Sequence, residues 1–253
     1  MDAFSLIIPS DIGPFAALAI LAASFLGSFI TVAMGIGGGA FLLAFMASFM
    51  PPVALIPVHG VVQLGSNVSR AVLFRRKIQW PPVWAFLFGS VLGIFAGGAI
   101  VVELPPGYIL IGVGGFVLFS VFSRPPKWLR RSAGLTGLVS SFLTMFFGAT
   151  GPFVATFVKS LSLDKQAHTG THASLMTIQH GLKVVTFGVL GFSFAPWAGF
   201  LIAMIVVGYL GTVVGRRVLL RISTEIFKQL LDAALVLISL HLIWRGGAQL
   251  IGG

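Results

Sequence analysis

The chain of 253 residues contains no cysteine and few acids. Without cysteine it has no disulfide, no thiol nucleophile and no thiolate metal ligand. Charged residues make up 9% of the sequence, whereas a soluble domain carries about a quarter. Mean hydropathy is +1.04 and hydrophobic residues reach 57%. This composition predicts a protein that uses lipid as its solvent.

Sequence signatures of catalysis are missing as well. The sequence contains no HExxH and no GxSxG, and it has no cysteine to pair with a histidine. A potassium-type filter sequence is also absent. We therefore expect no enzyme, no metal site and no cofactor. A membrane enzyme or an assembly subunit is the alternative from another functional class.

Six apolar stretches approach the length of a membrane span. A spanning helix needs about 17–25 residues, so some stretches must extend into their flanks. The acidic start, with Asp2 and Asp11, lacks the basic region of a secretory signal, so we expect the first stretch to remain as a membrane helix. The stretches are 14–33, 83–102, 108–122, 132–147, 197–214 and 230–244.

The formal net charge of +10 does not indicate a nucleic-acid partner, because the basic residues lie mostly in short loops between apolar stretches. They gather in 75–77, 124–131 and 216–228. Positive loops remain in the cytoplasm, whereas 103–107 and 191–196 have no basic residue and fit the outside. The bilayer is thus an expected partner, and nucleic acid is not.

The second half of the chain repeats the first at an offset of 113 residues, the difference between 38 and 151. Gly38 then falls on Gly151 and His59 on His172. The same offset pairs Gly35 with Gly148, Ala54 with Ala167, Arg70 with Lys183, Val72 with Val185 and Phe74 with Phe187. Duplicated helix breakers in an apolar chain indicate a transporter built from two structural repeats. We expect repeats at 1–123 and 132–253, joined by a cytoplasmic linker at 124–131.

The loop charges also constrain how these halves lie in the membrane. The second broken region, 148–189, lies between the apolar stretches 132–147 and 197–214, and the outer end of each stretch meets a cytoplasmic loop. The broken region therefore crosses zero or two times. Each half then has an odd number of crossings. We therefore predict an all-α polytopic protein with two inverted-topology repeats and both termini outside. Each broken region is either a re-entrant hairpin or a pair of crossings.

Two glycine-rich breaks are the first candidate binding elements. Glycine interrupts a helix and lets a ligand approach bare backbone. Backbone N–H groups at the start of the next helix attract anions. Close helix packing is the alternative use of such glycines. The candidate residues are Gly37, Gly38 and Gly39 in the first break, and Thr150, Gly151 and Pro152 in the second, where proline is expected at the first helical position.

Polar side chains at helical spacing form the second candidate element. Such side chains are costly in a membrane and usually face a bundle interior or a wet cavity. We expect His59 and His172 to contact a ligand or handle protons. Hydrogen bonding between helices, or snorkelling of Arg70 and Lys183, is the alternative. The full set is His59, Gln63, Asn67 and Arg70 in the first half, and His172, Gln179 and Lys183 in the second.

The ligand predicted by these groups is an anion. The six acids are Asp2, Asp11, Glu103, Asp164, Glu225 and Asp232, and none lies clearly in the middle of a span. Cation pumps usually rely on a buried carboxylate. We expect an anion near the bilayer centre, between Gly35–Gly39 and Gly148–Pro152.

The glycine-rich breaks, each followed by a short helix and a polar helix, resemble those of the TauE/SafE family of bacterial membrane permeases. The resemblance covers nearly the whole chain. It implies export of sulfite or an organosulfonate such as sulfoacetate across the bacterial cytoplasmic (inner) membrane. An importer or channel for another small anion or solute is the alternative. The sequence leaves open the coupling ion, the exact cargo and whether the protein forms a homodimer.

Overall fold

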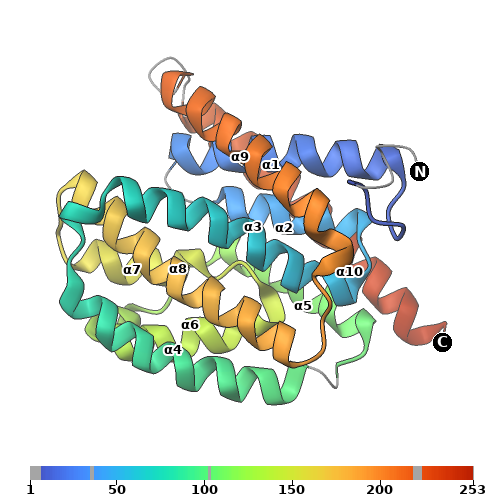
Figure 1. Ribbon diagram of the computed structural model, residues 1–253. Helices are drawn as coiled ribbons and strands as arrows, with labels where there is room; N and C mark the ends of the chain where they lie inside the picture. Colours follow the sequence, from blue (N-terminus) through green and yellow to red (C-terminus); the bar gives the residue numbers. More distant parts are fainter. Residues whose placement is uncertain (1–6, 35–36, 102–103, 219–223, 253) are drawn as a thin grey trace. The chain divides into compact units, whose positions relative to one another are not determined.

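The computed structural model describes residues 7–34, 37–101, 104–218 and 224–252, and within them it contains helices and no strand (Figure 1). The predicted all-α class is therefore confirmed. The α-helices are α1 Pro14–Met34, α2 Gly38–Phe49, α3 Pro52–Leu73, α4 Trp80–Val101, α5 Pro106–Phe122, α6 Ala133–Phe147, α7 Gly151–Ser160, α8 Lys165–Val189, α9 Ala198–Val218 and α10 Thr224–Ile251. Three short 3-10 helices are η1 Arg75–Lys77, η2 Lys127–Arg131 and η3 Ala195–Trp197.

Four of the described segments are long and apolar enough to cross a membrane. They have 19 to 24 residues and lie in α1, α4, α9 and α10. Three shorter apolar helices, α2, α5 and α6, accompany them. Four of the six apolar stretches found in the sequence therefore belong to helices that could cross a membrane, and the chain is a multi-pass membrane protein.

Both predicted breaks lie at equivalent positions. The helix before each break ends at Met34 in the first half and at Phe147 in the second, and the next helix begins at Gly38 or Gly151. Each pair of positions differs by the repeat offset of 113. Gly35 and Ile36 lie outside the described residues. Because α7 begins at Gly151, Pro152 is its second residue rather than its first.

The chain forms two compact units, and each unit draws helices from both halves of the sequence. Unit 1 comprises residues 1–59, 105–123 and 193–253, and unit 2 comprises residues 60–104 and 124–192. The repeats at 1–123 and 132–253, with their linker at 124–131, describe the order of elements along the chain and stay a prediction. The units describe which elements pack together.

In unit 2, α4 and α6 pack with their backbones in direct contact. A Cβ on Gly89 would overlap the carbonyl of Gly134, and one on Gly93 would overlap the carbonyl of Leu138. Residue numbers rise together along both helices, so α4 and α6 are parallel. Small residues permit this close approach, which is a common way of packing helices in membranes. We call this contact the α4–α6 seam.

Helix α8 runs in the same direction as α4. At its start a Cβ on Gly170 would lie 3.4 Å from Ile78, which precedes α4, and at its end Thr186 is 3.1 Å from a Cβ on Gly98. The backbone N–H of Gln79 also donates to the Thr171 hydroxyl at 3.0 Å. The three long elements α4, α6 and α8 are thus parallel within unit 2.

Helix α7 instead folds back along α6. Ser160, the last residue of α7, donates from its hydroxyl to the carbonyl of Arg130 at 3.2 Å, just before α6. Helices α6 and α7 therefore form a hairpin with the Gly148–Gly151 break at its tip. At 1.5 Å per residue the arms are about 22 and 15 Å long, and neither spans a hydrocarbon core of about 30 Å. These lengths favour re-entry over a pair of crossings.

Unit 1 contains an equivalent pairing, in which α1 comes from the first half of the chain and α9 from the second half. Its α1 runs parallel to α9, because Ser24 donates to the Met204 carbonyl at 2.8 Å and a Cβ on Gly215 would lie 3.1 Å from the Phe29 carbonyl. Gly38, the first residue of α2, lies in close contact with Gly27 of α1. From this contact α2 runs back along α1. Both units therefore pair the first helix of one half with the fourth helix of the other half.

Candidate functional site

The break in unit 2 has the backbone geometry of a helix end followed at once by a helix start. Gly148 adopts φ 71° and ψ −29°, a left-handed conformation that caps α6. Thr150 then occupies the N-cap position of α7, and its side chain makes no capping hydrogen bond. The Thr150 hydroxyl is therefore not occupied by the helix that it precedes.

The Thr150 hydroxyl belongs instead to a buried chain of polar groups that joins three elements. The amide of Gln179 on α8 donates to the Thr150 hydroxyl at 2.6 Å, and Ser140 on α6 donates to the Gln179 side-chain oxygen at 2.9 Å. All three side chains are 0% exposed. The structure thus brings two of the predicted residues, Thr150 and Gln179, into direct contact.

The paired histidines make the same contact in the two units. The Nε2 atom of His59 lies 3.0 Å from the carbonyl of Gly39, in the first turn of α2. The Nε2 atom of His172 lies 3.5 Å from the carbonyl of Gly151, in the first turn of α7. Because a carbonyl only accepts hydrogen bonds, Nε2 carries the proton in both contacts. Each histidine therefore ties a long polar helix to the start of a short helix.

The polar residues of α3 bond largely along their own helix. Asn67 donates to the Gln63 carbonyl at 2.7 Å and accepts from Arg70 at 2.9 Å. Arg70 also donates to the carbonyl of Ser66 at 3.3 Å. These predicted site residues form a local ladder in which the Arg70 guanidinium already has partners.

Lys183 is in a different situation from Arg70, its counterpart at the repeat offset. The Lys183 side chain is 0% exposed, and its amine has no hydrogen-bond partner among the described residues. Its stem packs on α3, where a Cβ on Gly60 would lie 2.8 Å from Cε. The snorkelling that the sequence left open for Lys183 does not occur. Lys183 lies four residues after Gln179, on the same face of α8.

The two glycine-rich breaks differ in what surrounds them. A Cβ on Gly38 would overlap the backbone of Gly27, so close packing accounts for this glycine. Gly37 has φ 100°, a backbone conformation that favours glycine. In contrast, the nearest atom to a Cβ on Gly151 would be 3.8 Å away, at Met176. Packing therefore explains Gly38 but leaves Gly151 without such an explanation.

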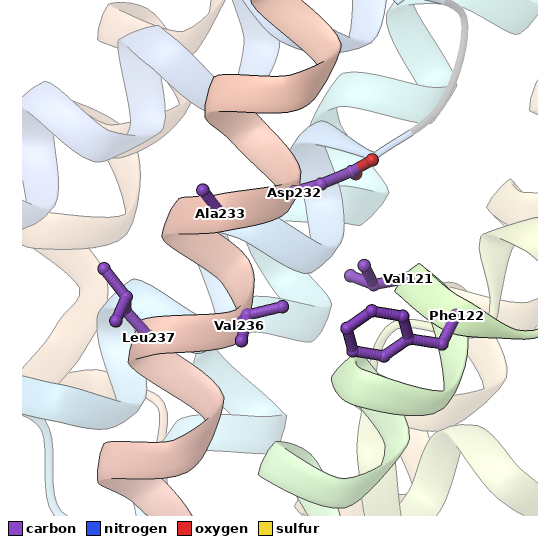
Figure 2. A pocket seen from close by; sticks show the side chains of 6 residues that line it. All are labelled: Val121, Phe122, Asp232, Ala233, Val236 and Leu237. Carbon is purple, nitrogen blue, oxygen red and sulfur yellow. The ribbon is translucent and has the colours of Figure 1, made fainter.

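An apolar groove of about 500 Å³ lies in unit 1, and none of the predicted site residues lines it. It is open, and Figure 2 shows Val121 and Phe122 of α5 on one side and Val236 of α10 on the other. Its carboxylate, Asp232, accepts a hydrogen bond from Lys228 at 2.6 Å. With apolar walls and an acid that is already paired, the groove does not provide donors for an anion.

The described acid nearest to the polar helix of unit 2 has a structural role. Asp164 caps α8 by accepting from the backbone N–H groups of Gln166 at 2.8 Å and Ala167 at 2.9 Å. The Ala167 N–H, and then the Gln166 N–H and the charge of Lys77, hold the pKa of this carboxyl below its ordinary value. Among the described residues no group of three or more histidines and acids could hold a metal ion.

Sequence reasoning missed two residues that bond to the predicted elements. Ser140 lies in an apolar stretch, where a serine also fits simple helix packing. Arg245 of α10 donates to the carbonyls of Ala47 at 3.3 Å and Ser48 at 2.8 Å, at the end of α2. Its position directly after the last apolar stretch, away from the basic loops, was the available signal, since an arginine at membrane depth needs partners.

The family comparison agrees with this arrangement of breaks and polar helices. A family model described as sulfite exporter TauE/SafE matches residues 20–242, nearly the whole chain. The chain belongs to the TauE/SafE family. Its membership makes it a membrane transport protein with a small sulfur-containing anion as the family's type of substrate. No curated protein and no solved structure matches the chain.

Proposed function

We propose that this TauE/SafE protein exports sulfite or an organosulfonate, such as sulfoacetate, by alternating access. The observation that carries the proposal is the hairpin break of unit 2, where Thr150 and Gln179 are buried polar groups next to a helix start. Helix starts favour anions, and buried hydroxyl and amide donors bind oxyanion oxygens. Gly37, Gly38 and Gly39 occupy the corresponding break in unit 1, where His59 of α3 contacts Gly39.

Helix directions within unit 2 support inverted repeats. Residues 60–73 of α3 run antiparallel to α8, because a Cβ on Gly60 would lie 2.8 Å from Lys183 Cε and one on Gly170 would lie 2.9 Å from Phe74 Cβ. The repeat offset makes α3 and α8 equivalent helices of the two halves. Two halves with the same orientation would make this pair parallel. Inverted repeats are a common basis of alternating access.

The length of the hairpin arms supports a site at membrane depth. The basic segments η1 and η2 lie at the starts of α4 and α6, which are parallel, so they mark the same end of unit 2. If that end is cytoplasmic, the tip at Gly148–Gly151 lies about 15–22 Å into the membrane. A hydrocarbon core of about 30 Å then places the tip near its middle.

The membrane potential supports the outward direction. An inside-negative potential moves each negative charge outward with about 2.3 kcal/mol per 100 mV. A divalent anion gains twice this free energy. The acid described in unit 2, Asp164, is exposed and caps the start of α8, so the described part of this unit provides no buried carboxylate that would couple a cation to import.

Flux in proteoliposomes tests the proposal. We expect saturable sulfite flux that increases when the potential is negative on the side from which sulfite leaves. We also expect His172→Ala and Gly151→Leu to reduce it at least tenfold, because both change the start of α7. If both variants transported sulfite as fast as the wild-type protein, this site would be rejected. Flux that never saturates would indicate a channel, and absence of flux for every sulfur anion would reject the function.

A further inference from the structure

Unit 2 contains a buried amine for which the described residues supply no partner and no counter-charge. The Lys183 amine is 0% exposed and has no partner. The acid described in unit 2 is Asp164, which is exposed and caps the start of α8. It is 19 residues before Lys183 (183 minus 164), or about 28 Å along the helix. Burying an amine without a partner is costly, so the site suits a ligand that pairs with it.

Hydrogen-bond donors at Gln179, one helical turn before Lys183 on α8, and at its partner Thr150 are also left over. The Thr150 hydroxyl accepts from Gln179, but no acceptor for its own proton is found in the described structure. The Gln179 amide has two N–H groups and uses one of them on Thr150. Ser140 fixes this amide by donating to its oxygen. The cluster therefore offers spare donors and has no spare negative group.

The equivalent cation of the first half does not share this property. Arg70 donates to Asn67 and to the carbonyl of Ser66, both on its own helix. The repeat offset pairs Arg70 with Lys183, yet the two cations have different surroundings. The duplication has therefore left one of the two cations with partners and the other without.

We propose that Lys183, Thr150 and Gln179 form a subsite in unit 2 that binds one small oxyanion of sulfur. The Lys183 amine pairs with the charge, and the Thr150 hydroxyl and the second Gln179 N–H donate to oxygen. The ligand therefore has a negative charge and at least two oxygens, as sulfite and sulfonates do. The subsite deepens the proposed export function and rests on it for the choice of sulfur anions.

Ligand-dependent thermal stability of the purified full chain in detergent tests this subsite. The probes are sulfite, thiosulfate, sulfoacetate and methanesulfonate against a constant chloride background, with neutral methanesulfonamide as the control ligand. At least one anion is expected to raise the Tm of the wild type in a concentration-dependent manner. We expect Lys183→Met, which keeps the length of the side chain, to raise its Kd at least tenfold. Thr150→Val is expected to raise it several-fold.

Two matched controls separate the subsite from general effects. Lys159→Met removes an exposed positive charge from α7 of the same unit. Thr177→Val removes a hydroxyl that bonds to its own helix at Ala173. Both variants are expected to keep the wild-type Kd. If Lys183→Met does not fold, Lys183→Arg and Thr150→Val decide the matter, with binding kept in the first and weakened in the second.

Several outcomes would overturn the subsite. They are unchanged binding in Lys183→Met, unchanged binding in Thr150→Val, an equal response to methanesulfonamide, and no wild-type response to any of the four anions. Flux measurements keep the two proposals apart. Sulfite flux that survives Lys183→Met rejects the subsite and leaves export intact. Binding that depends on Lys183 in a protein without flux rejects export and leaves the subsite intact.

Discussion

At the scale of single residues, the two histidines show how far sequence reasoning reaches. The repeat offset singled out His59 and His172 as an equivalent pair, because both lie at the same distance from a glycine break. Their contact with the carbonyls of Gly39 and Gly151 was not predicted. Such a contact depends on the side-chain rotamer and on how the short helix packs, and residue spacing determines neither.

Lys183 and Arg70 show the same limit of sequence reasoning. The repeat offset makes these two residues equivalent, and only the side chains around them in the structure distinguish them. Asn67 lies three residues before Arg70 and accepts its hydrogen bond, whereas His180 stands at the matching position before Lys183. An asparagine oxygen accepts readily, so this single difference contributes to the different bonding of the two cations.

The N-cap of α8 gives a pH-dependent prediction at this scale. The pKa of Asp164 is lowered from its ordinary 3.8, so its charged form stabilises the folded state above the unfolded pKa. This contribution is lost as the pH falls through the lowered folded pKa. The Tm of the wild type should therefore fall more steeply between roughly pH 5 and pH 3 than that of Asp164→Asn.

Asparagine also caps helices but does not titrate, so Asp164→Asn isolates the charge. At neutral pH we expect Asp164→Ala to have a lower Tm than Asp164→Asn, since alanine caps poorly. The measurement is thermal unfolding in detergent across the pH range. Parallel pH profiles for the wild type and Asp164→Asn would contradict the role assigned to the charge.

At the scale of helices, the sequence predicted which segments are helical and where they break. Apolar length predicted α1, α4, α5, α6, α9 and α10, and the glycines predicted the starts of α2 and α7. It did not predict which helices pair, since any glycine-lined face can pack against another. The α4–α6 seam therefore became apparent only from the structure.

The seam makes a direct prediction about stability. Gly93→Leu places a side chain against the carbonyl of Leu138, and the backbone cannot yield as a flexible side chain would. We expect a loss of about 1–3 kcal/mol or more in the free energy of unfolding. Gly115→Ala in α5 is the control, because a Cβ there meets nothing within 4 Å. Thermal unfolding of both variants measures the difference, and equal stability would refute the role of the seam.

At the scale of the whole molecule, the sequence predicted two equivalent halves but not the two compact units. Each unit takes helices from both halves. This exchange depends on pairings such as that of α1 with α9, which join residues far apart in the chain. Local patterns describe neighbours within one segment and carry little information about such long-range partners.

Membrane orientation is tested on the intact protein. Because the chain has no cysteine, single cysteines introduced at exposed positions report accessibility without background. We expect Ser10→Cys and Gly252→Cys to react with a membrane-impermeant maleimide in intact cells. Lys127→Cys should react only after permeabilisation. Labelling of Lys127→Cys in intact cells would reverse the proposed orientation.

The seam also bears on how related sequences diverge. Where a glycine touches the backbone of the other helix, as Gly93 touches Leu138 and Gly137 touches Phe86, a smaller neighbour cannot compensate for a substitution, because every residue has the same backbone carbonyl. Positions 89, 93 and 137 should therefore remain glycine in descendants that keep this helix pair, even where the surrounding lipid-facing residues exchange freely. A relative with a bulky residue at any of them would have to separate the two helices.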